Sequence, residues 1–295
     1  MHADLSILFS RQHGVATSAQ ILQVVSRRHL EMLLECTAVE RIWHGVYSLG
    51  PADDERRLRG LDISCGEQVA VCLSTAARAH GFDTEDRPDL HVLNPTRHQL
   101  RPAPGLVIHR RDGAPLTTVS GRLATTAGWT AVEVARALPR PRALATLDAA
   151  LRSGHCDPGT LSRAAVGQSG RRGIVKVRDL LPRADGRSES PMESEARLVM
   201  IDGGLPEPVL QHEVVDVGGR LWRLDFAWPE AMVAAEYDSN QWHTGEEALR
   251  HDREKQAALQ DLGWIVVPIV LNDVRRRRRE LVERICAHLD RASAA

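Results

Sequence analysis

Residues 192–289 alternate between helical and strand periodicity, and this order of elements constrains the fold more than any other feature of the chain. Apolar residues recur every three to four positions in helices and at every second position in half-buried strands. The expected order is a helix at 192–202, strands at 209–215, 220–227 and 232–237, a helix at 246–262, a strand at 264–270 and a helix at 273–289. The strand at 232–237 is the most apolar, so we expect it at the centre of a sheet.

Acidic residues interrupt these apolar elements. Glu193 lies at the start of the first helix, Asp225 lies in the run LWRLDFAWP, and Glu236 lies in VAAEYDSNQWH. Because neighbouring carboxylates repel one another, elements that bring three of them together favour a divalent cation. We therefore expect a Mg²⁺ or Mn²⁺ site with Asp225 and Glu236 as ligands, and with Glu193 acting through the water shell of the metal. Such a cation neutralises phosphate charge and lowers the pKa of a bound water.

Further candidates for proton transfer surround these acids. Asp238 lies two residues after Glu236, on the same side of a strand, and is expected to be a ligand or to orient His243. We predict that His243 acts as the general acid or base, with Lys255 or His251 as the reserve candidates.

This arrangement resembles the PD-(D/E)XK nuclease fold, and more closely its very-short-patch-repair (Vsr-like) endonuclease branch. The matching residues are Ser190, Pro191, Glu193, Ser194, Asp225, Phe226, Glu236, Tyr237, Asp238, Trp242, His243, Asp252, Lys255, Leu259, Gly263 and Trp264. The resemblance implies a restriction-endonuclease-like mixed sheet flanked by helices, and a hydrolase that cuts or nicks DNA. The chain departs from the pattern at two places. Asp238 stands where the broad fold usually has lysine, and Ser239 with Asn240 replaces a common glycine.

Each of these residues also has a structural interpretation. Glu193 could respond to the helix dipole, Asp252 and Lys255 could pair on a helix surface, and His243 could simply be packed beside Trp242. The alternative function is a nuclease fold that has kept its shape for partner binding without catalysis.

The N-terminal segment predicts three short helices and a hairpin. Apolar faces at 5–9, 21–25 and 30–34 mark the helices, and strands at 39–43 and 46–49 flank the turn at His44. This order is typical of a winged helix-turn-helix, whose third helix enters the major groove of DNA while the wing touches the backbone. The expected DNA-binding residues are Arg27, Arg28, His29, Arg41 and His44. Protein docking is the alternative use of such a module.

The stretch AVERIWHGVYSLG, together with the helices before it, resembles the N-terminal domain of AbiEi-type antitoxins. The resemblance implies a DNA-binding autorepressor in a toxin-antitoxin setting, with a cognate toxin as a further partner.

Residues 51–186 predict a mixed α/β connector with little recognisable chemistry. Helices are expected at 69–80, 129–137, 142–151 and 160–165, and strands at 90–93 and 106–110. The predicted fold class is therefore α/β (α+β) in three domains: a winged helix at 1–50, the connector at 51–186 and the nuclease-like domain at 187–295.

The composition restricts the possible functions but does not identify one. The formal net charge is -1, so any basic surface that meets nucleic acid must be local, and the run at 275–279 is the most cationic stretch. The five cysteines are scattered without metal spacing, which indicates a reducing compartment. Neither a signal peptide nor a long apolar run is evident, so we expect a cytoplasmic protein that does not enter a membrane.

Overall fold

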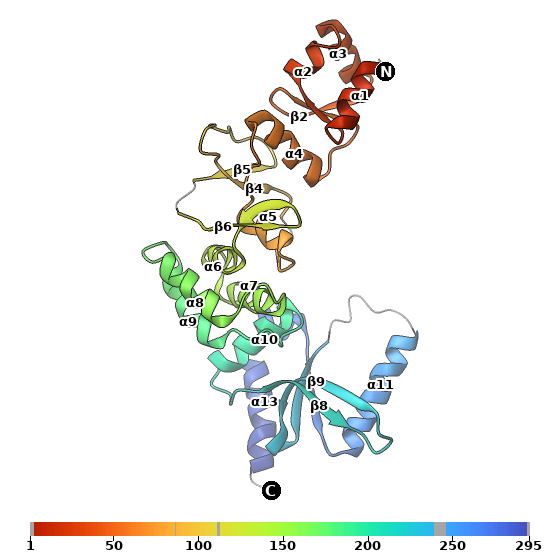
Figure 1. Cartoon of the computed structure of the whole chain (residues 1–295). Helices are drawn as coiled ribbons and strands as arrows, with labels where there is room; N and C mark the ends of the chain where they lie inside the picture. The colour runs from red at the N-terminus through yellow and green to blue at the C-terminus, as the bar shows by residue number, and fades with distance from the viewer. Residues whose placement is uncertain (1–2, 86, 111–112, 239–245, 294–295) are drawn as a thin grey trace. The chain divides into compact units, whose positions relative to one another are not determined.

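The computed structural model describes residues 3–85, 87–110, 113–238 and 246–293 (Figure 1). The fold is mixed α/β, as the sequence predicts. The chain divides into two compact units: unit 1 comprises residues 1–80 and 85–130, and unit 2 comprises residues 81–84 and 131–295. The three-domain division at 1–50, 51–186 and 187–295 stays a prediction.

The N-terminal part of unit 1 contains the expected helices and hairpin. Its elements are α1 (Ala3–Arg11), β1 (Val15–Thr17), α2 (Ser18–Leu22), α3 (Arg27–Glu35), β2 (Val39–Trp43) and β3 (Val46–Leu49). Thr17 caps α2 through a reciprocal capping box with Gln20, and Ser26 caps α3 by accepting a hydrogen bond from the His29 amide. The strands form a sheet of order β1-β3-β2, in which the short β1 was not expected. A separate hydrophobic core that includes Phe9 and Leu30 supports this module.

The rest of unit 1 contains α4 (Asp54–Cys65), α5 (Leu73–Ala79), β4 (Leu90–Leu93), β5 (Leu106–His109), β6 (Leu116–Val119) and β7 (Arg122–Thr125). The predicted strands at 90–93 and 106–110 are confirmed, and they pair in parallel as β4 and β5. The predicted helix at 69–80 begins only at Leu73, because Val71 instead forms bridges with Val92 and Ala124.

Unit 2 begins with helices. They are α6 (Ala127–Ala137, in unit 2 from residue 131), α7 (Arg140–Arg152), α8 (Pro158–Gly167), α9 (Ile174–Leu180) and the short 3-10 helix η1 (Leu181–Arg183). The helix α10 (Pro191–Asp202) packs on α7. Between them, Arg197 and Asp148 form an ion pair of 2.6 Å whose side chains are 2% and 0% exposed.

The remainder of unit 2 is a four-stranded sheet. Its elements are β8 (Val209–Val215), β9 (Leu221–Trp228), the 3-10 helix η2 (Pro229–Ala231), β10 (Val233–Tyr237), α11 (Glu246–Asp261), β11 (Ile265–Ile269), α12 (Leu271–Arg275) and α13 (Arg278–Ser293). The strand order is β11-β10-β9-β8, with β10 and β11 parallel and the other pairs antiparallel. The expected central place of the strand at 232–237 is therefore confirmed. The expected single helix at 273–289 is wrong, because it breaks between Arg275 and Arg278.

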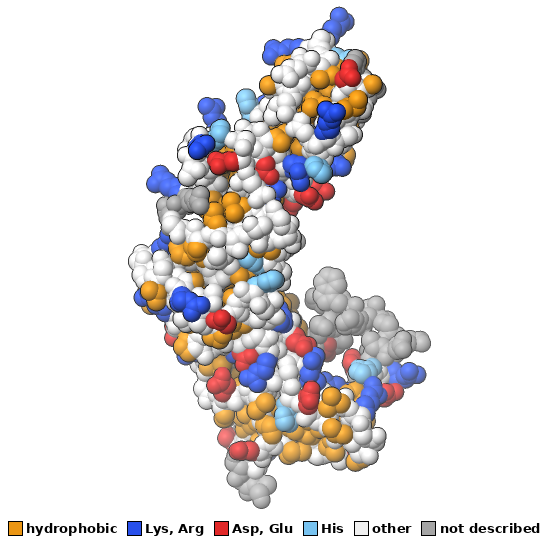
Figure 2. Space-filling view, viewed as in Figure 1, with side chains coloured by type: hydrophobic (Ala, Val, Ile, Leu, Met, Phe, Trp, Pro, Cys, Tyr) orange, Lys and Arg blue, Asp and Glu red, His pale blue; other side chains and the backbone are white. Residues whose placement is uncertain are grey.

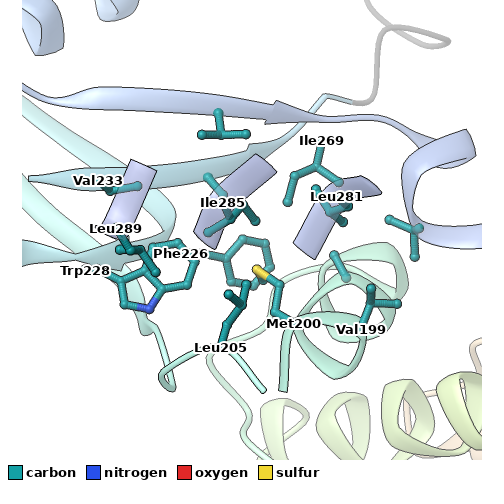
Figure 3. Close-up of a cluster of buried hydrophobic side chains, with 14 of the residues drawn as sticks. Val199, Met200, Leu205, Phe226, Trp228, Val233, Ile269, Leu281, Ile285 and Leu289 are labelled. Carbon is teal, nitrogen blue, oxygen red and sulfur yellow. The ribbon is translucent and has the colours of Figure 1, made fainter. Parts of the chain in front are cut away.

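Helices cover both faces of this sheet (Figure 1). On one face, Phe226 and Trp228 of β9 pack with Met200 of α10 and with Ile285 and Leu289 of α13 (Figure 3). On the other face, Trp222, Leu224 and Ala234 pack with Leu259 of α11. In β10, Val233 and Ala235 belong to the first core and Ala234 to the second, which is the physical basis of the period-two pattern. Strand β9 does not alternate along its whole length, because Trp222 and Leu224 belong to the second core whereas Phe226 and Trp228 belong to the first.

Both edge strands of the sheet are interrupted. In β8, Gln211 has a φ of 51°, which a residue with a side chain rarely adopts, and it is absent from the otherwise regular pairing of β8 with β9. In β11, Pro268 has no amide hydrogen to donate.

Candidate functional site

Glu193 is fixed at the start of α10 by local hydrogen bonds. Ser190 caps the helix by accepting a hydrogen bond from the Glu193 amide at 3.1 Å. The Glu193 carboxylate accepts hydrogen bonds from the Glu189 amide at 2.8 Å and from Nε2 of Gln211 at 3.1 Å. Glu193 is buried at 8% exposure. The helix cap and the hydrogen bond from Gln211 together hold its carboxylate in place.

Asp225 and Glu236 lie on the neighbouring strands β9 and β10. Oδ2 of Asp225 accepts a hydrogen bond of 2.9 Å from the Tyr237 amide, which ties the side chain to the end of β10. Glu236 forms an ion pair with Lys255, which reaches over from α11. Nζ of Lys255 also donates a hydrogen bond of 2.7 Å to the backbone oxygen of Arg223.

These residues line a hollow of about 340 Å³ between the sheet and α11, named here the carboxylate pocket. Its lining residues are Asp225, Glu236, Tyr237, Asp238, Asp252, Lys255, Gln256, Leu259, Val266 and Pro268. In Figure 2, acidic and basic side chains gather in unit 2 beside the hollow next to α11. The pocket thus joins polar groups from two strands and a helix.

Electrostatics couples the three predicted acids. Burial raises the pKa of Glu193, Asp225 and Glu236 above the ordinary carboxyl range. The negative charge of Asp225 further raises the pKa of both Glu193 and Glu236, whereas Lys255 lowers that of Glu236. Asp225 therefore lies within electrostatic reach of both other acids, although Glu193 does not line the pocket.

The described residues contain no group of three or more histidine, cysteine, aspartate or glutamate side chains arranged to hold a metal ion. The Mg²⁺ or Mn²⁺ site at Asp225, Glu236 and Glu193 stays a prediction. The donor chemistry does fit a hard cation. The ammonium of Lys255 is held by a carboxylate and a backbone carbonyl, both of which are ligand types that Mg²⁺ takes.

The other predicted residues fall in different places. Asp238 lines the pocket together with Glu236, whereas His243 lies outside the residues that the structure describes. His251 contacts Nη2 of Arg220 at 2.9 Å and is not a lining residue of the pocket. Lys255, for which a surface pair with Asp252 was the alternative interpretation, instead pairs with Glu236.

Two residues of the site were not singled out from the sequence for these contacts. Tyr237 positions Asp225 through its backbone amide, and Gln211 positions Glu193 through its side-chain amide. The residue type does not indicate a hydrogen bond from a backbone amide, because every residue except proline has that donor. The strained φ of Gln211 likewise has no sequence signal, since glutamine is not typical of that conformation.

The predicted DNA-binding residues lie on the N-terminal module. Arg27 and Arg28 are exposed in the first turn of α3, and His29 beside them is half-buried. Arg41 is exposed on β2, and His44 is exposed in the turn before β3. The module therefore presents cationic side chains at both positions where the sequence pattern predicts phosphate contacts.

All five arginines of the run at 275–279 are exposed where α12 meets α13. Three of them pair with acids: Arg275 with Glu195, Arg277 with Asp273, and Arg279 with Glu283. The run therefore combines local ion pairs with a basic surface.

Comparison with known proteins identifies the class of the middle segment. Residues 69–183 match the family model of the AbiEi antitoxin C-terminal domain, a stretch that extends from before α5 to η1. This stretch is therefore similar to an AbiEi antitoxin C-terminal domain, and it lies in the part of the chain for which the sequence predicts no site. It is 52% identical over 271 residues to the uncharacterised protein MT2308 of Mycobacterium tuberculosis strain CDC 1551 / Oshkosh and to the uncharacterised protein Rv2248 of strain H37Rv. The match covers 92% of this chain and 100% of each relative, so the chain belongs to the same family as these mycobacterial proteins.

No helix among the described residues is both long enough and apolar enough to cross a membrane.

Proposed function

We propose that this protein is a DNA-binding repressor of the AbiEi antitoxin type, which acts together with a cognate toxin. The match of residues 69–183 to the AbiEi antitoxin C-terminal domain carries the proposal. The relatives are uncharacterised, so the domain match is the functional information that the comparisons supply.

The N-terminal module supports the DNA-binding part of this proposal. Its helices α2 and α3 are followed by the hairpin of β2 and β3, which is the element order of a winged helix. Arg27 and Arg28 are exposed at the start of α3, which would be the recognition helix. Ser26 caps that helix, so its first turn is held in a defined conformation before DNA arrives.

The test is binding to a duplex from the chain's own promoter, measured by fluorescence anisotropy against a scrambled duplex of equal length. The double variant Arg27→Ala and Arg28→Ala should bind more weakly, and the salt slope should fall by about 2 for two lost phosphate contacts. Arg163→Ala is the matched control, because Arg163 is an exposed arginine of α8. Equal affinity for both duplexes, or an unchanged salt slope in the double variant, would contradict the proposal.

A toxin partner needs a separate test. Coexpression with the product of the neighbouring gene should rescue growth if that product is toxic. Rescue that persists after residues 69–183 are replaced by an unrelated domain would rule out a role of the AbiEi-type part.

We propose metal-dependent endonuclease activity as a second function, favoured by the carboxylate pocket. Asp225 and Glu236 from adjacent strands, with Lys255 beside them, are the kinds of group that phosphodiester hydrolysis requires. Mg²⁺ bound there would neutralise phosphate charge and lower the pKa of a water. Lys255 would supply a positive charge near the phosphate, at the site where the strand position Asp238 lacks one.

Nicking of supercoiled plasmid in Mg²⁺ or Mn²⁺ tests this second function. Asp225→Asn keeps the shape of the side chain and removes its charge, so it should abolish nicking. Asp261→Asn, on the same chain but outside the pocket lining, should leave nicking unchanged. Nicking that survives in Asp225→Asn would show that the activity resides elsewhere.

A further inference from the structure

Lys255 connects α11 to two strands of the sheet. Its side chain is only 20% exposed, although most of its neighbours on α11 face solvent. The ammonium pairs with Glu236 of β10 and donates to the backbone oxygen of Arg223 in β9 at 2.7 Å. A lysine loses rotational freedom when it is held in this way, so the contact must offset that cost by electrostatic attraction.

The charges around this ammonium do not balance. Among the residues that the structure describes, the lining of the carboxylate pocket contains four acids, Asp225, Glu236, Asp238 and Asp252, and one cationic side chain, Lys255. Glu193 adds a further negative charge close to Asp225. Among these described lining residues, acidic side chains therefore outnumber cationic ones even with Lys255 in place.

The oxygen atoms that hold Lys255 are a carboxylate and a backbone carbonyl, which are ligands that a divalent cation also uses. One group of oxygens cannot serve both cations at full strength, because the two positive charges would repel each other at close range.

We propose that Lys255 is a built-in competitor for a divalent cation in the carboxylate pocket. Its ammonium occupies Glu236 and the Arg223 carbonyl until a cation displaces it, and the displaced ammonium is then available to contact a phosphate. This inference rests on the second proposed function. It adds that Lys255 sets the cation concentration at which the pocket becomes occupied.

Substitution of Lys255 should change metal affinity in the direction opposite to substitution of a residue that helps to bind the metal. Removing a helper of a metal site weakens metal binding, whereas removing a competitor strengthens it. Lys255→Gln should therefore bind Mn²⁺ roughly tenfold more tightly than the wild type, or more, since a like charge is removed from close range. Lys255→Arg keeps the charge and should stay close to the wild type.

The experiment is calorimetric titration of Mn²⁺ into the full chain, without DNA. Arg253→Gln is the matched control, because it removes one exposed positive charge from the same helix outside the pocket lining. Its affinity should equal that of the wild type. Adding Glu236→Gln to Lys255→Gln should abolish the gain.

Thermal unfolding gives a second readout that does not depend on activity. Lys255→Gln should melt at a lower temperature without Mn²⁺, and its melting temperature should rise more steeply with Mn²⁺ than that of the wild type.

The outcomes separate the two proposals. If the Lys255 and Arg253 variants bind Mn²⁺ as tightly as the wild type and Glu236→Gln abolishes binding, the metal site stands and the competitor role of Lys255 is wrong. Weaker binding by Lys255→Gln also overturns the competitor role. If no variant binds Mn²⁺ and none gains stability from it, the metal site fails and the competitor role fails with it.

Discussion

Two regions of unit 2 bury carboxylates, and they compensate the charge differently. Between α7 and α10, the Asp148 carboxylate accepts one hydrogen bond from the Arg197 guanidinium and one from the Asp185 amide. In the carboxylate pocket, the ammonium of Lys255 pairs with Glu236, whereas Asp225 accepts a hydrogen bond from the Tyr237 amide and feels Lys255 only through its charge. The first arrangement is what a stable core needs, whereas the second leaves charge for a ligand to compensate.

Breaking the ion pair between Arg197 of α10 and Asp148 of α7 should destabilise the fold more than neutralising an acid of the carboxylate pocket. Arg197→Ala leaves the Asp148 carboxylate buried without its cation, and we expect a loss of roughly 3–5 kcal/mol in the free energy of unfolding. Urea denaturation followed by circular dichroism measures this. The double change Asp148→Leu with Arg197→Met should recover much of the loss. A loss in Arg197→Ala below that of an average surface substitution would contradict the comparison.

A buried histidine beside a half-buried one offers an intermediate case. In unit 1, Nδ1 of His91 lies 2.9 Å from Nε2 of His109, and burial and the charge of His109 lower the pKa of His91 to about 4. Because the unfolded histidine binds its proton near pH 6.5, the unfolded state takes up protons first and stability falls as the pH drops from about 6.5 to about 4. The loss should reach roughly 2–3 kcal/mol at the acid end of that window.

Urea midpoints between neutral and acidic pH test this prediction. His91→Asn should flatten the dependence, and His98→Asn, which changes an exposed loop histidine, should leave it unchanged. An identical pH profile in the wild type and His91→Asn would refute the assignment.

Neutralising an acid of the pocket should have a smaller effect, with the opposite sign. The pKa of Asp225 is raised by burial, so its ionised form opposes folding at neutral pH. The folded state binds this proton more tightly than the unfolded state does, and stability therefore decreases as the pH rises through the carboxyl range. Asp225→Asn should leave the free energy of unfolding unchanged or raise it by up to about 1 kcal/mol at pH 7.

Denaturation of Asp225→Asn should be compared with that of Asp261→Asn on the surface side of α11. A loss of several kcal/mol in Asp225→Asn, comparable to that expected of Arg197→Ala, would mean that the two regions use their charges in the same way.

The smallest effect is expected at the arginine run. Arg279 pairs with Glu283, but their side chains are 91% and 58% exposed. Solvent and salt screen such a pair, so Arg279→Ala should not change the urea midpoint beyond experimental error. A clear shift would indicate that this exposed run supports the fold.

The sequence predicted most of the sheet region and its acids, because alternation and helical spacing are strong signals in residues 192–270. It did not predict the break before Arg278, since five consecutive arginines give no apolar period from which a helix end can be located. Nor did it predict the partner of Lys255. Residues 236 and 255 meet only because β9 and β10 pair and α11 packs over them, which is a long-range consequence of the fold.

In the middle segment, local patterns located β4, β5, α6, α7 and α8 but missed the helices α4 and α9 and the short strands β6 and β7. The contact between His91 and His109 was also missed. His91 and His109 are 18 residues apart and meet through the parallel pairing of β4 with β5, so their spacing carries no ligand signal.

The interrupted edge strands have a consequence for association. A continuous open edge would offer its free amide and carbonyl groups as a template on which another chain could add a strand. Pro268 in the edge strand β11 has no amide hydrogen to donate, and Gln211 in the edge strand β8 has a left-handed backbone conformation. Both edges are therefore poor templates, and the protein at high concentration should resist aggregation by strand addition to this sheet.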